Sequence, residues 1–151
     1  MDALHSILVD MHSINRWLVL FSGLYVLFLS GRGWFGKQVW DDRAGRFGKY
    51  FPMLLDIQAL LGLVLYFVFL SRQGGFEHVF GNPASRFFLM EHSVMMALVL
   101  ILAHAGAYFV KKAAPENKFK RMFLFYGIAF LLLLAAIPWP FMPGYGRPWL
   151  F

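Results

Sequence analysis

The sequence has no cysteine and few charged residues, and both shortages narrow the functions open to it. Without thiols the 151-residue chain cannot form disulfides, iron–sulfur clusters, thiolate metal sites or the covalent bonds of c-type haem. Charged residues make up only 15% of it. It also lacks a glycine-rich phosphate loop, a nucleophile elbow and any spacing such as HxxxH that would pre-form a zinc site.

Apolar residues are abundant instead, at 60% of the chain, and they gather in long blocks. Each block is close to the roughly 20 residues that cross a bilayer core. Backbone amides in hydrocarbon must be satisfied within their own segment, and runs such as LLGLVLYFVFL do not alternate as barrel strands do. We therefore expect one all-α domain, an integral membrane four-helix bundle, with spans at about 14–30, 52–70, 87–110 and 122–137.

The basic residues give the topology. Ten of the fourteen lie in or beside the first and third loops. The positive-inside rule places these loops in the cytoplasm and both termini outside, so the net charge of +6 is a topology signal and does not indicate nucleic-acid binding. The ten are Arg32, Lys37, Arg43, Arg46, Lys49, Lys111, Lys112, Lys118, Lys120 and Arg121.

Ionisable residues within the spans are costly, so each is a candidate for function. His12 and His92 fall at similar depths near the outer surface, on the first and third spans. His104 is twelve residues beyond His92, about 18 Å deeper at 1.5 Å per residue. Two neutral imidazoles that face each other across a bundle are typical axial ligands of b-type haem. We therefore expect one haem, with its iron held by His12 and His92.

Residues around this pair suit a haem pocket. Arg16, one turn after His12, and Arg86 are candidate partners for the propionates. Gly23 returns to the His12 face after about three turns and would leave space for a flat ring, and Met96 would supply an apolar wall.

Other interpretations of these residues stay open. His12 could cap a helix start, and Glu91 could pair with His92 at the interface. His5 is a substitute ligand, and His78 lies further out in the second loop. Glycines including Gly23 could instead be points of close helix packing.

Asp56 and His104 form a second candidate site, at similar depth in the cytoplasmic half of the second and third spans. Each would be costly alone, and together they could satisfy one another. Three interpretations are open: a quinone or proton site, a second haem ligated by His104, and a buried pair that fixes helix register.

Four segments, MHSINRWLVL, DIQALLGLVLYF, EHSVMMALVLILAHAG and AAIPWPF, carry a resemblance. They look like a family of small bacterial four-helix membrane proteins commonly labelled cytochrome b. The resemblance implies a haem-binding protein of an electron-transfer chain, with His12, His92 and His104 at the family's histidine positions. In layout the chain is also similar to larger di-haem cytochromes, but it has one clear depth-matched histidine pair where those have two.

Together these patterns favour a b-type cytochrome subunit of a bacterial cytoplasmic membrane, acting within a larger respiratory or photosynthetic complex. It would exchange electrons with quinone or an outer-side carrier, and its neighbours would be lipid and other membrane subunits or further copies of itself. We expect an electron-transfer or accessory subunit more than an enzyme on its own. The alternatives are a cofactor-free structural subunit and a small proton- or quinone-handling protein.

Overall fold

The computed structural model describes residues 2–149, apart from the side chains of Asp2 and His78, and within these residues it is all helical without a strand. The helices are α1 (Asp2–Phe35), α2 (Asp42–Phe47), α3 (Tyr50–Arg72), the 3₁₀ segment η1 (Phe76–Gly81), α4 (Pro83–Arg86), the π-helical segment η2 (Phe87–His92), α5 (Ser93–Lys112) and α6 (Pro115–Ala136).

The expectation of four membrane-spanning helices is confirmed, but each helical stretch is longer than its apolar block. The long apolar stretches cover residues 3–35, 42–72, 83–112 and 115–136. The third is a composite in which α4, η2 and α5 follow one another without a break. Hydropathy identifies only the apolar part of a helix, which lies in the bilayer core. Helical backbone hydrogen bonding continues beyond it into charged segments such as the start of α6.

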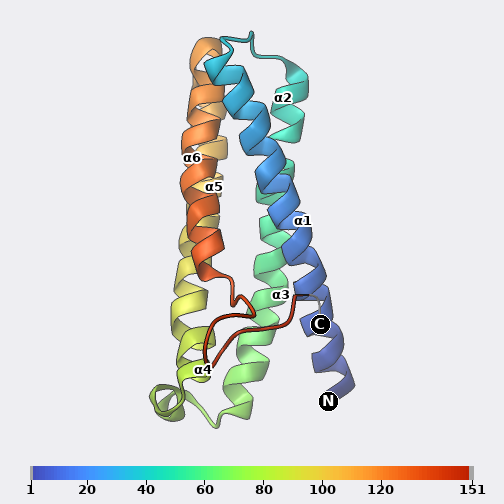
Figure 1. Ribbon diagram of the computed structural model, residues 1–151, viewed down its shortest axis with the longest axis vertical. Helices are drawn as coiled ribbons and strands as arrows, with labels where there is room; N and C mark the ends of the chain where they lie inside the picture. Colours follow the sequence, from blue (N-terminus) through green and yellow to red (C-terminus); the bar gives the residue numbers. More distant parts are fainter. Residues whose placement is uncertain (1, 150–151) are drawn as a thin grey trace.

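The four long helices form an up-down bundle in which both chain ends lie at the same end (Figure 1). α1 packs mainly on α3 and α6, and α5 packs mainly on α6 and α3. α1 and α5 therefore stand diagonally opposite each other. We call the end that holds the termini the histidine end, and the end that holds α2 and the α5–α6 junction the basic end.

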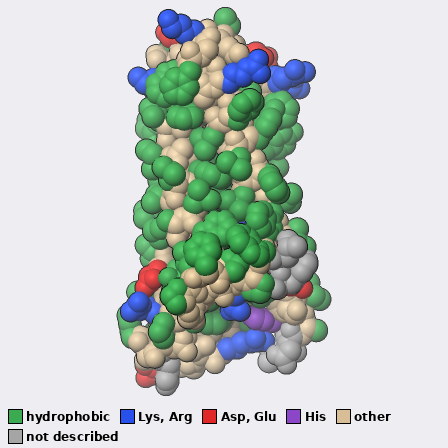
Figure 2. All heavy atoms as spheres, viewed as in Figure 1, with side chains coloured by type: hydrophobic (Ala, Val, Ile, Leu, Met, Phe, Trp, Pro, Cys, Tyr) green, Lys and Arg blue, Asp and Glu red, His purple; other side chains and the backbone are tan. Residues whose placement is uncertain are grey.

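The outer surface of the bundle is apolar over its middle, and Lys and Arg side chains gather toward its two ends (Figure 2). Large hydrophobic side chains such as Phe28, Leu60 and Ile101 are more than half exposed there. A soluble protein does not expose so much continuous apolar surface, so the natural surroundings are a lipid bilayer. The core between the helices is filled by buried side chains that are each at most 5% exposed: Val19, Phe51, Leu55, Val99, Tyr126 and Phe130.

Close helix contacts occur at glycines. A Cβ on Gly23 would lie 2.5 Å from the ring of Phe130, and one on Gly106 would lie 2.7 Å from Cβ of Phe125. Gly23 thus makes room for the Phe130 side chain on α6. The expectation that Gly23 leaves space for a haem is wrong, because a core aromatic ring fills that space, and its alternative interpretation as a packing point is correct.

After α6 the chain turns back over the histidine end (Figure 1). Ile137, the residue before Pro138, takes an extended conformation, as residues before proline prefer, and this ends the helix. The Trp139 indole donates to the carbonyl of Leu134 at 2.8 Å. Residues 137–149, which we call the tail, then reach α1, where the carbonyl of Trp149 accepts a hydrogen bond from the indole of Trp17 at 2.8 Å.

Candidate functional site

His12 of α1 and His92 at the end of η2 face each other at the histidine end of the bundle. Their ring centroids are 6.4 Å apart, and the ring planes are inclined at 64°. The juxtaposition expected from matched depth is confirmed, although the residues are 80 positions apart in the sequence. Because α1 and α5 are diagonal neighbours, the pair lies across the bundle and not along one helix face.

A π-helical turn places His92. The segment Phe87–His92 has π-helical hydrogen bonding, and the hydroxyl of Ser93 donates to the carbonyl of Phe88 at 2.8 Å. A π-helical turn contains more residues than an α-helical turn, so it rotates the side chains that follow to a different face of the helix. Such turns are frequent at functional sites. The Nδ1 atom of His92 lies 2.8 Å from the carbonyl oxygen of Ala136 at the end of α6. Nδ1 must carry the proton to donate to that carbonyl, which leaves Nε2 as the free lone pair.

His12 has no such anchor. Its Nδ1 atom is buried and makes no hydrogen bond, and its ring packs against Gly62 of α3, where a Cβ would lie 3.2 Å from Cε1 of the imidazole. One turn further along α1, the Nε atom of Arg16 is also buried without a partner. Among the described side chains, these are the two buried nitrogen or oxygen atoms without a hydrogen bond. Orphaned polar atoms are rare in folded proteins, and two on adjacent turns mark a place where a partner is expected.

A polar connection to α3 holds α1 beside this site. The side-chain amide of Asn15 donates to the carbonyl of Leu54 at 3.1 Å and to Oε1 of Gln58 at 2.7 Å. Gln58 in turn donates to the backbone carbonyl of His12 at 3.1 Å. Asn15 and Gln58 are only 6% and 5% exposed. Their hydrogen bonds fix the height and rotation of α1 at the turn that carries His12.

The tail closes one side of the site. Tyr145 stacks on Phe87 with centroids 4.0 Å apart, and the Arg147 guanidinium lies 5.0 Å from the centre of the Phe88 ring. The second guanidinium nitrogen of Arg16 donates to the Trp149 carbonyl at 2.6 Å. A pocket of about 240 Å³ beside His92 has Tyr145, Met95 and Ala136 among its walls.

The donor set at this site is two imidazoles. Among the described side chains there is no group of three or more His, Cys, Asp or Glu that could hold a metal. Metal–imidazole bonds are about 2 Å long, so two imidazoles on one metal place their ring centres roughly 6 Å apart. The observed 6.4 Å agrees with this. The 240 Å³ pocket is lined by His92 and not by His12, and it is smaller than the roughly 300 Å³ at which cofactor pockets begin, so it is not a ready-made space for a haem between the two rings.

The remaining residues predicted for this site are placed differently. Arg86 pairs with Glu91, with Nε 2.9 Å from Oε1, so it is engaged on the surface. The alternative pairing of Glu91 with His92 is therefore not formed, because Glu91 binds Arg86 and His92 binds Ala136. Met96 packs against the core, and Met95 is the methionine that lines the pocket beside His92. The side chain of His78 lies outside those that the structure describes.

The second candidate pair is also brought together. Nε2 of His104 lies 2.7 Å from Oδ1 of Asp56. Their side chains are 51% and 48% exposed, so the pair lies on the outer surface of the bundle, between α3 and α5, where lipid would surround it. The expected contact is confirmed, and of the three open interpretations the buried pair does not hold, because about half of each side chain is exposed.

Sequence reasoning missed Asn15. Its position, three residues after His12 and on the buried face of an apolar helix, was the available signal, because an amide in a membrane span needs a partner on a neighbouring helix. Gln58, two residues after Asp56, does not share its helix face: Gln58 is buried against α1, whereas Asp56 is exposed.

We found no match to this chain among protein-family models, curated proteins or solved structures. The resemblance drawn from the four segments therefore stays an expectation that depends on those residues alone.

The Asn15–Gln58 connection predicts energetic coupling between α1 and α3. Gln58→Leu should destabilise the bundle by about 1 kcal/mol, the usual value of an interhelical hydrogen bond in a membrane protein. Reversible unfolding in mixed micelles, measured for Gln58→Leu, Asn15→Leu and the double variant, gives the coupling. Effects that add within about 0.3 kcal/mol would mean that the two side chains act independently.

Proposed function

We propose that this chain is a b-type cytochrome subunit of a bacterial cytoplasmic membrane, with one haem held by His12 and His92. The observation that supports it most is the pair of facing imidazoles, one with Nδ1 held by the Ala136 carbonyl and the other with Nδ1 buried and unpartnered. A ligating histidine ordinarily donates its second nitrogen to a carbonyl or carboxylate, which fixes the ring and its tautomer.

Each neighbouring residue has a role in this proposal. The Ala136 carbonyl orients His92, and Gln58 holds the backbone of His12 in place. Arg16 offers an unpartnered Nε as a donor for a propionate. Gly62 leaves room for the His12 ring. Bound haem would supply one-electron transfer, and the protein would supply the ligands, their orientation and an apolar surrounding.

The test is the dithionite-reduced minus oxidised absorption spectrum of the detergent-purified chain, with a pyridine haemochrome to count haem. We expect about one b-type haem per chain, retained in His104→Ala and lost in His92→Ala and His12→Ala. Circular dichroism of each variant shows whether the helices are intact. A spectrum without haem bands from well-folded wild-type protein would contradict the proposal and favour the cofactor-free accessory subunit. Normal haem content in His92→Ala would remove this residue as a ligand.

A second role is proposed for His104 and Asp56, as the place where a membrane quinone meets the protein. The pair is hydrogen-bonded and faces lipid, so a quinone can reach it from the bilayer without entering the bundle. His104 is seven residues before Lys111, about 10 Å below the basic end at 1.5 Å per residue. There it can exchange a proton with a quinol while Asp56 orients its ring.

The matched variants are Asp56→Asn and Asp42→Asn, because both carboxylates lie toward the basic end and only Asp56 contacts His104. Stopped-flow reduction of the haem by a short-chain quinol should slow about a hundredfold in Asp56→Asn, the usual size of a lost acid–base contribution, and stay unchanged in Asp42→Asn. Wild-type rates in Asp56→Asn would leave the pair as a structural contact. Reduction by dithionite controls for loss of haem.

The orientation in the membrane is part of the same proposal. The α1–α3 connection and the α5–α6 junction lie together at the basic end (Figure 1). These connections and the helix ends beside them carry ten of the fourteen basic residues, which by the positive-inside rule favours a cytoplasmic basic end and an outer histidine end.

Single cysteines test this orientation against a wild-type chain that has none. Gly81→Cys lies at the histidine end with no atom within 4 Å of its Cβ position, and Gln38 is an exposed residue at the basic end. In intact spheroplasts, a membrane-impermeant maleimide should label Gly81→Cys at once and Gln38→Cys only after permeabilisation. The opposite pattern would invert the topology.

A further inference from the structure

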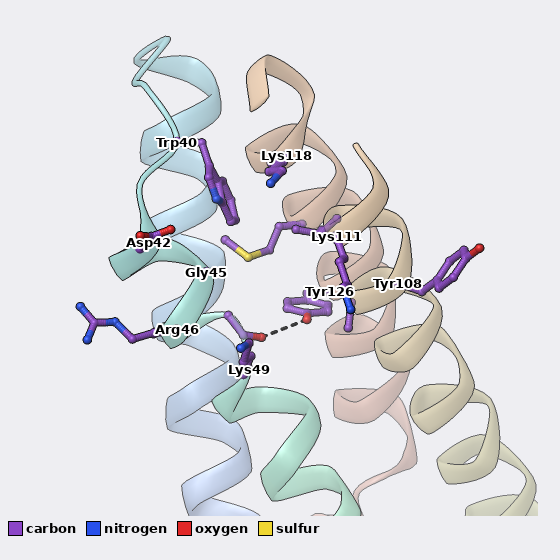
Figure 3. Close-up of a pocket in the computed structure, with 13 residues that line it drawn as sticks. Trp40, Asp42, Gly45, Arg46, Lys49, Tyr108, Lys111, Lys118 and Tyr126 are labelled. Carbon is purple, nitrogen blue, oxygen red and sulfur yellow. Dashed lines mark hydrogen bonds between the residues drawn. The ribbon is translucent and has the colours of Figure 1, made fainter. Parts of the chain in front are cut away.

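A large cavity lies at the basic end, far from the histidine pair. It has a volume of about 590 Å³ and lies between α2 and the start of α3 on one side and α5 on the other, with α6 behind it (Figure 3). Short residues leave it open, because Gly45, Gly48 and Ala107 form parts of its wall. Gly48 must be small, since a Cβ there would lie 2.8 Å from the sulfur of Met122.

The rim of this cavity is cationic. Four basic side chains and one carboxylate line it. In Figure 3, Arg46 points away from the opening, whereas Lys111 and Lys118 extend over it from α5 and α6. The ammonium group of Lys118 lies 5.5 Å from the centre of the Trp40 ring, so the lysine is held at the edge by a cation–π contact. Neither lysine forms a salt bridge with a described carboxylate.

The inner wall of the cavity is apolar. Val110 and Met122 belong to it, together with the ring of Tyr126. The Tyr126 hydroxyl donates a hydrogen bond to the carbonyl of Gly48 at 3.0 Å. Its polar group therefore has a partner, and its ring contributes apolar surface to the cavity wall. A cavity with an apolar wall and a cationic rim suits a ligand that is apolar at one end and anionic at the other.

We propose that this cavity binds an anionic phospholipid, with its phosphate at Lys111 and Lys118 and part of an acyl chain along Val110 and Met122. The position agrees with this choice, because the basic end of the bundle is where lipid headgroups meet the protein. Basic pockets between membrane helices are known to bind anionic headgroups. A free phosphate ion would bind the lysines but leave the apolar wall of the cavity exposed to water. A phospholipid covers both parts, so it matches the cavity better.

Native mass spectrometry of the full chain in detergent tests the proposal, with dioleoylphosphatidylglycerol as the probe and dioleoylphosphatidylcholine as the uncharged comparison. The key variant is Lys111→Gln/Lys118→Gln, and its matched control is Lys112→Gln/Lys120→Gln, which removes two lysines of the same end that do not line the cavity. We expect one tightly retained phosphatidylglycerol, bound about thirtyfold more weakly in the first variant and unchanged in the second, since each of the two lysines near an anionic lipid contributes on the order of 1 kcal/mol.

A second variant tests the apolar half without changing charge. Ala107→Phe places a ring in the cavity and should lower retention of the lipid while the circular dichroism and melting temperature of the empty protein stay the same. Equal weakening in both lysine variants would overturn the proposal and indicate a general surface attraction. Equal retention of both lipids, displacement by millimolar inorganic phosphate, or unchanged retention in Ala107→Phe would overturn it as well.

Discussion

The hydrogen bonds between Asn15, Gln58 and the carbonyl of His12 hold α1 against α3, and the geometry of the histidine end depends on them. In a bilayer the lipid is as apolar as the helix surfaces, so burial alone does not fix how far one helix slides along another. Shape contacts and interhelical hydrogen bonds must do so. Here the hydrogen bonds are made at the turn that carries His12, and any slip of α1 would carry that ring away from His92.

The opposite side of the pair is fixed by a different means. The π-helical turn before α5 sets the rotation of His92, and the end of α6 supplies the carbonyl that holds its ring. His92 is thus held by two elements, the π-helical turn and the end of α6, whereas His12 is held through its backbone and has a buried ring nitrogen without a hydrogen bond. The difference makes the His92 ring the more constrained of the two.

Much of this arrangement could be predicted from the sequence, because hydrocarbon imposes simple rules. Span length, the need for internal hydrogen bonds and the distribution of lysine and arginine gave four helices, and helix rise gave the matched depth of His12 and His92. The same reasoning brought Asp56 and His104 together. It failed for Gly23, since a glycine marks close approach without telling whether the neighbour is a ligand or a side chain such as Phe130. It also could not place the tail or the cavity at the basic end, which depend on how several helix ends diverge or turn back.

The tail carries a consequence for the order of assembly. Residues 137–149 follow α6 and are made after the four helices, yet they supply Tyr145 beside His92 and the Trp149 carbonyl that engages Arg16. Helices of a nascent chain can insert and associate as they emerge, so the histidine end stays uncovered until the last of these residues leaves the ribosome. If the proposed haem binds here, it would meet an open site during that interval and a covered one afterwards, so the time of synthesis would be the moment for it to enter.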